Sequence, residues 1–178
     1  MEFENEESRL LFLRYALPCS ETLVKRGVIS QSYRRRLMKA IFLNKKIPEN
    51  SEKIFKVANL MCEKIARKLG KKSIDENIVR KYFLFEHDKV VDKRYKIFRD
   101  FDPLACRLYS GKVINIKNRK ATVQTIVRRK KYGMYPFQNL KTGDYVVVHR
   151  NIIIEKINES LAKKLWKLKE NYFKSNKA

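Results

Sequence analysis

The chain is poor in residues that break, bridge or loosen a backbone, with only 5 Gly, 4 Pro and 3 Cys among 178 residues. So little Gly and Pro excludes long flexible linkers and low-complexity segments. The three cysteines, Cys19, Cys62 and Cys106, are odd in number and far apart, which excludes a disulfide framework and the spacing of a zinc ribbon. We therefore expect free thiols and a reducing compartment.

Long apolar runs are also missing, and none approaches the roughly 18 residues that a membrane span needs. The short apolar stretch 10–17 is broken by Arg14, and acidic residues precede it where a secretory signal would be basic. We expect a cytoplasmic protein. The sequence has no glycine-rich phosphate loop, nucleophile elbow or H-E-x-x-H pattern, so we also expect a protein without enzymatic activity.

Acidic residues are scarce relative to basic ones, since 42 Lys and Arg stand against 19 Asp and Glu for a formal charge of +23. The part after residue 101 is the more basic per residue. Such a charge favours polyanionic partners, nucleic acid above all. The alternative is a lysine-rich cytosolic protein that is this basic without binding nucleic acid, and charge alone does not separate the two.

The first hundred residues show the 3.6-residue period of helices, and we predict a helical domain over 1–102. Ser30 is a good N-cap for a helix, and Ser73 to Glu76 has the form of a capping box. The helix that starts there is expected to fade near 87–92. Residues 93–102 are expected to form a charged aromatic connector.

At Cys106 the apolar period changes from 3.6 to 2, which is typical of strands. We predict a strand from Cys106 to Ile116, a turn at Asn118-Arg119 and a return strand that completes a hairpin. Further strands are expected over 132–138, 145–149 and 152–154, with a basic tip at 128–131 and a last helix from about residue 158. Several short strands with close turns predict a small OB-like β-barrel with a C-terminal helix over 103–178. The fold class is then α+β.

This C-terminal pattern resembles the HypC/HupF family of hydrogenase-assembly chaperones. The resemblance is carried by C-R-L-Y-S-G-K-V, which starts at Cys106, by G-D-Y-V-V-V-H, which ends at His149, and by I-I-I-E-K-I-N-E-S-L-A from Ile152. It spans Ala105 to Tyr172 and leaves the helical part unmatched. The family has a proline before its G-K-V, where this chain has Ser110.

The resemblance implies a small OB-like barrel that takes part in the maturation of [NiFe] hydrogenase through protein contacts. Its partners are a maturation factor and the large-subunit precursor. The family's working cysteine carries over to Cys106 and its supporting histidine to His149. Two ligands do not make a tight site, so we expect no tightly bound cofactor, but iron shared with a partner protein.

Each of these residues also has a plain structural interpretation. Cys106 can be an inert small residue where a strand begins, although Arg107 beside it would favour the thiolate. His149 can be a satisfied edge histidine. We expect Cys62 in the core, Cys19 in a structural role and His87 at a solvated helix end.

A second functional hypothesis is a module that binds single-stranded RNA or DNA through the same barrel. OB-like barrels do this with basic loops and exposed aromatic rings. The candidate residues are Arg128, Arg129, Lys130, Lys131, Tyr132 and Tyr135. The competing interpretation is that these rings fill the barrel and the charges are solvated.

Overall fold

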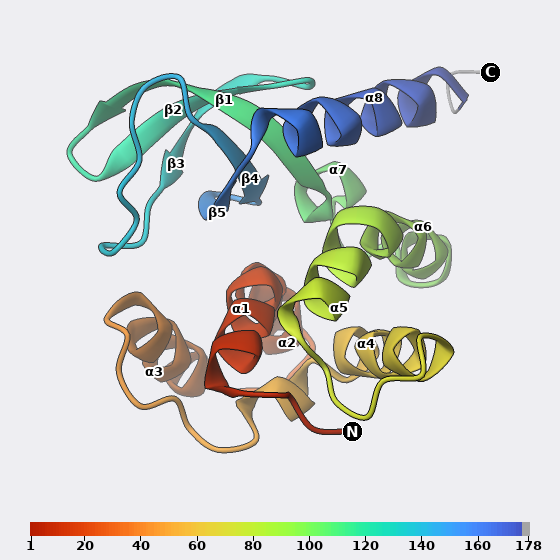
Figure 1. Ribbon diagram of the computed structural model, residues 1–178. Helices are drawn as coiled ribbons and strands as arrows, with labels where there is room; N and C mark the ends of the chain where they lie inside the picture. Colours follow the sequence, from red (N-terminus) through yellow and green to blue (C-terminus); the bar gives the residue numbers. More distant parts are fainter. Residues whose placement is uncertain (176–178) are drawn as a thin grey trace. The chain divides into compact units, whose positions relative to one another are not determined.

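The computed structural model describes residues 1–175 and divides the chain into two compact units (Figure 1). We call Met1–Cys106 the helical unit and Arg107–Ala178 the barrel unit. The first consists of helices, and the second is a closed five-stranded barrel with one helix. The predicted α+β fold, with a helical N-terminal part, a small barrel and a C-terminal helix, is confirmed.

The helical unit is built from short helices joined by tight turns. They are α1 (Glu6–Ala16), the 3₁₀ turn η1 (Leu17–Cys19), α2 (Ser20–Lys25), α3 (Gln31–Phe42), the 3₁₀ turn η2 (Ser51–Ile54), α4 (Lys56–Lys68), α5 (Glu76–Lys81), the π-helical turn η3 (Tyr82–Glu86), α6 (His87–Phe98) and α7 (Pro103–Cys106). The segments α5, η3 and α6 follow one another without a break. The expected fading near 87–92 and the expected connector from residue 93 are therefore wrong. The helix continues because Val91 is buried, and it ends where Arg99 adopts a left-handed conformation.

Side-chain caps start several of these helices. The Ser30 side chain accepts a hydrogen bond from the Tyr33 N–H, as predicted. The cap of α5 is Asp75, which accepts from the Ile78 N–H, so the cap lies two residues later than the Ser73 that the capping-box pattern suggested. Serine and aspartate are about equally favourable N-caps, so the sequence pattern alone did not show whether Ser73 or Asp75 caps the helix.

An aromatic cluster forms the centre of the helical unit. The rings of Tyr15 and Phe83 are stacked with centroids 4.8 Å apart, and Phe12 meets Phe83 edge-on at 5.7 Å. All three side chains are buried. Rings in such offset and edge-to-face arrangements add to the stabilisation that burial alone provides.

The barrel unit contains β1 (Leu108–Lys117), β2 (Lys120–Thr125), β3 (Arg129–Gly133), β4 (Tyr145–His149), β5 (Ile152–Ile157) and helix α8 (Glu159–Ser175). The strand order β1-β2-β3-β5-β4 closes on itself, so β1 pairs with both β2 and β4. Closure between β3 and β5 rests on one parallel pair, Gly133 with Ile152. The pairing register shifts by one residue in β1, at Ile114, and in β5, at Ile154, and such bulges allow the sharp bending that a small barrel needs.

The predicted hairpin turn is confirmed. Asn118 and Arg119 join β1 to β2, and both have φ near +55°, as in the two-residue turn that matches the twist of paired strands. The basic run is placed differently from the prediction, because Arg129–Gly133 is strand β3, paired with β2. The expected tip at 128–131 and the expected strand over 132–138 are therefore wrong. Because side chains alternate along β3, Tyr132 points into the barrel core. The strand therefore covers residues 129–133 and not the predicted 132–138.

Helix α8 packs on the outer face of β1 (Figure 1). The buried Ser110 hydroxyl donates to the Ala162 carbonyl at 2.9 Å. The Arg107 guanidinium lies 4.2 Å from the centre of the Tyr172 ring and donates to its hydroxyl at 2.6 Å. These contacts attach both ends of the helix to the first residues of the barrel unit. Within residues 1–175, no helix has the length and apolar character needed to cross a bilayer.

Candidate functional site

Cys106 ends helix α7 and does not open a strand as predicted. The helix forms because Asp102-Pro103 is a cap followed by a residue that suits the first helical turn. The Asp102 carboxylate accepts from the Leu104 N–H at 2.8 Å, and its carbonyl accepts from the Cys106 N–H at 3.1 Å. Strand β1 starts two residues later, at Leu108. The Cys106 side chain is buried, with 5% of its surface exposed.

His149 is the last residue of β4, and its backbone is paired with Leu108 of β1. Val146 and Val148 point into the barrel core, so alternation places His149 on the opposite face of the strand. Leu108, which pairs with His149, follows Cys106 in the sequence with only Arg107 between them. The strand register is therefore compatible with the predicted pair of thiol and imidazole, and the pair itself stays a prediction.

The sequence suggested Arg107 as the cation that favours the Cys106 thiolate, whereas the structure brings Arg26 close to Cys106. The Arg107 guanidinium is buried against Tyr172, as described above. Within the helical unit, the pKa of Arg26 is raised mainly by its hydrogen bonds to Asp100, and the Cys106 thiolate adds a smaller contribution. Arg26 is thus within electrostatic range of Cys106. Because the two residues are far apart in the sequence, no local pattern indicated this proximity.

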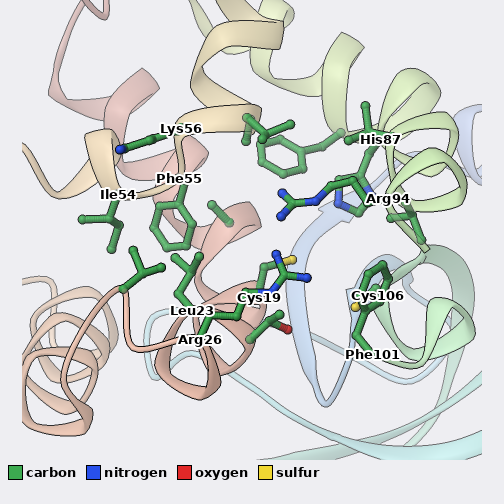
Figure 2. Close-up of a pocket in the computed structure, with 18 of the residues that line it drawn as sticks. Cys19, Leu23, Arg26, Ile54, Phe55, Lys56, His87, Arg94, Phe101 and Cys106 are labelled. Atoms are coloured by element: carbon green, nitrogen blue, oxygen red, sulfur yellow. The ribbon is translucent and has the colours of Figure 1, made fainter. Parts of the chain in front are cut away.

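A pocket of about 300 Å³ opens in the helical unit (Figure 2). Every residue that lines it belongs to this unit, and most are apolar, from α2, α4, α6 and the turns beside them. The polar part of the lining includes Cys19, His87 and Cys106 together with Arg26 and Arg94. Two of the three thiols of the chain and one of its two histidines therefore face a single cavity.

Cys19 and His87 come close together in this pocket. The Cys19 sulfur and a ring nitrogen of His87 lie within 4.8 Å of each other. His87 is buried and packs against the rings of Tyr82 and Phe83 with centroids 5.9 and 5.7 Å away. The expectation of a solvated helix end for His87 is therefore wrong. The apolar run before it, Tyr82 to Phe85, is the signal that could have predicted its burial.

Cys62 behaves as expected for a core residue. It is fully buried in α4 and does not line the pocket. Burial raises the pKa of its thiol far above the ordinary value, so this thiol stays protonated and unreactive. It provides an internal reference for experiments on the other two cysteines.

The candidate nucleic-acid residues do not form a stacking surface. Tyr132 belongs to the barrel core, and Tyr135 is 1% exposed and stacks on Phe137 at 5.3 Å. A base needs an exposed ring face to stack on, so neither tyrosine can serve as predicted. The charged residues remain available: Arg129 is exposed and Lys130 half-buried along β3. The competing interpretation, rings inside the barrel with solvated charges, fits these residues better.

The comparison with protein families adds a finding for the barrel unit. A search of the curated proteins found no match to the chain. Residues 106–168 match the model of the HupF/HypC family. The matched segment starts at Cys106 and takes in the whole barrel and more than half of α8. The resemblance predicted from the sequence is thus confirmed for this part of the chain, which is similar to the HupF/HypC family.

Proposed function

We propose that this chain is a non-enzymatic accessory protein that takes part in the maturation of a [NiFe] hydrogenase. The observation that carries the proposal is the match to the HupF/HypC family, which begins at the predicted working cysteine, Cys106. The barrel unit binds a protein partner, either a maturation factor or the precursor of the hydrogenase large subunit. The protein acts in the cytoplasm.

Cys106 and His149 are the residues that we propose for the contact with iron. A thiolate is a soft ligand that suits iron, and an imidazole is a common second ligand. Two ligands from one chain leave most of the coordination sphere open, so iron is held jointly with the partner and is passed on as cargo. This arrangement explains why the function needs a protein complex.

The test is a binding measurement between the full-length chain and a purified large-subunit precursor of a [NiFe] hydrogenase. We expect the wild-type chain to be retained and Cys106→Ala to lose at least about tenfold in affinity, since the contact cysteine is gone. Cys62→Ala is the matched control, because it removes a thiol of the same chain that lies in the core. The fluorescence of Trp166, the only tryptophan, verifies that the barrel unit is folded in each variant.

Equal retention of the wild type and Cys106→Ala would show that Cys106 is not the contact residue. Absence of binding for the wild-type chain to both the precursor and a maturation factor would refute the proposed function itself. Reduced retention of Cys106→Ala together with Cys62→Ala would indicate a general loss of structure, and far-UV circular dichroism, which reports on the helices of both units, distinguishes that case.

A further inference from the structure

The helical unit, which except for Cys106 lies outside the segment matched to the family, contains the pocket described above. Its volume of about 300 Å³ lies at the lower end of the range for small-molecule sites, roughly 300–1,000 Å³. Most of the lining is apolar, and Arg26 and Arg94 bring positive charge to it (Figure 2). The geometry points to a second role for this chain: the helical unit binds a small monocarboxylic acid, with the apolar tail in the pocket and the carboxylate at the two arginines.

The apolar wall of the pocket comes from separate segments of the helical unit. Leu23 belongs to α2, Phe55 joins η2 to α4, and Val91 belongs to α6. An apolar cavity without a ligand forgoes van der Waals contacts along its wall, and water finds few hydrogen-bond partners there. An apolar tail therefore fills this space better than water does. Because burial of each methylene group strengthens binding about fourfold, the length of the tail should determine the affinity.

The two arginines carry one more positive charge than their neighbouring carboxylate compensates. Their guanidinium groups lie over the same ring, 4.4 Å (Arg26) and 5.5 Å (Arg94) from the centroid of Phe98. Asp100 accepts two hydrogen bonds of 2.7 Å from Arg26 and so compensates one of the two charges. No Asp or Glu is among the described residues that line the pocket. A single negative charge from a ligand therefore compensates the second cation.

A carboxylate suits this position better than a phosphate group. A phosphate monoester carries a charge of about −1.5 to −2 at neutral pH, which exceeds the one uncompensated cation, whereas a carboxylate carries a single charge. A planar guanidinium group can also donate two parallel hydrogen bonds to a carboxylate. In Figure 2 the guanidinium groups of Arg26 and Arg94 turn toward the same region of the cavity. The head group of the ligand is therefore expected in this region.

The test measures the binding of straight-chain carboxylates to the full-length chain by isothermal titration calorimetry. We expect one equivalent to bind, and octanoate to bind about 16-fold more tightly than hexanoate, since it buries two more methylene groups. The uncharged 1-octanol has a tail of the same length and should bind at least about tenfold more weakly than octanoate. Equal affinities for octanoate and 1-octanol, or for octanoate and hexanoate, would overturn the inference.

Arg94→Met is the variant that tests the head-group contact, because methionine retains an unbranched apolar side chain and removes the charge. We expect octanoate to bind at least about tenfold more weakly to it, and 1-octanol to bind with the wild-type affinity. Arg35→Met is the matched control, since Arg35 is exposed on α3 outside the pocket lining and its loss changes the net charge equally. Far-UV circular dichroism verifies that both variants are folded. Equal losses of octanoate affinity in the two variants would refute the contact.

A second measurement needs no variant and so does not depend on variants that fold. Cys19 lines the pocket, whereas Cys62 is fully buried outside it. At a free octanoate concentration of about ten times Kd, roughly one chain in eleven is unoccupied, so the alkylation of Cys19 should slow about tenfold while that of Cys62 is unchanged. Equal alkylation of Cys19 with and without octanoate would refute the site. Both measurements use this chain alone, so their outcome does not depend on whether the barrel unit binds a hydrogenase precursor.

Discussion

Gly111, the glycine of the G-K-V motif, lies so close to the neighbouring strand β2 that there is no room for a Cβ. A Cβ at this position would lie 2.6 Å from the Gln124 carbonyl oxygen and 2.6 Å from Val123 Cγ1. Gly111 is paired with Thr125 on one side and Val146 on the other, so neither neighbouring strand can retreat without losing ladder hydrogen bonds. We expect Gly111→Ala to destabilise the barrel unit.

The expected magnitude follows from the atoms involved. Overpacking a well-packed core by one methyl group costs about 1–3 kcal/mol, and a fixed backbone oxygen puts this site in the upper half of that range. In a unit of this size, 1 kcal/mol shifts the melting temperature by about 4–8 °C, so a fall of about 10 °C or more is expected. Trp166 is the only tryptophan and lies in α8, so its fluorescence in urea reports on the barrel unit.

Gly133→Ala is the matched control in the same barrel. The nearest atom to its added Cβ is the Asn151 carbonyl oxygen at 3.7 Å, an ordinary contact. Because alanine also restricts the unfolded chain more than glycine does, we expect a change within about 0.5 kcal/mol. A Gly111→Ala protein that unfolds at the wild-type urea concentration would refute the close-approach argument, as would equal losses at both glycines.

Three further predictions concern charges and hydrogen bonds. Desolvation lowers the pKa of Lys169, which lies over the Tyr109 ring, from 10.5 to about 7. Between those values the unfolded chain holds a proton that the folded chain has lost, so urea titrations should show stability that rises from pH 7 to 10, and the rise should vanish in Lys169→Met. The guanidinium of Arg26 holds the pKa of Asp100 below its ordinary value, so carboxyl NMR should show this pKa rising in Arg26→Ala. Ser110→Ala should cost about 0.5–1.5 kcal/mol in the Trp166 assay, because the hydrogen bond to Ala162 is lost.

The parts of the fold that local pattern determines could be predicted from the sequence. The period of 2 after Cys106, the turn at Asn118-Arg119 and the spacing of the motif around His149 identified a small barrel. In each of these places, local preference and burial act in the same direction. The errors lie where they compete: Arg129–Gly133 is rich in charge, yet Tyr132 has to be buried, and this requirement makes the segment a strand.

The composition of the pocket could not be predicted, because it depends on tertiary packing between distant segments. Cys19 follows Pro18 in a 3₁₀ turn, and His87 follows a π-helical turn, a feature that no residue pattern indicates. Their proximity arises from how η1 and the start of α6 are brought together within the helical unit. Arg26 and Cys106 are a similar case. Local signals for Cys106 were available in Asp102-Pro103, which favours a helical turn over a strand.

The position of Cys106 at the end of α7 determines how it can meet a partner. Only 5% of the Cys106 surface is exposed, so we expect a reagent or a partner to reach the thiol through a local opening of α7, whose first turn is held by the Asp102 cap. Replacing a cap by alanine costs about 1 kcal/mol, which raises the population of the open form about fivefold. We therefore expect Asp102→Ala to speed the alkylation of Cys106 about fivefold, as followed by mass spectrometry, with Cys62 as the reference in the same chain. Asp102→Asn retains a capping side chain and should react at nearly the wild-type rate. Equal rates in Asp102→Ala and the wild type would mean that Cys106 is reached without opening α7.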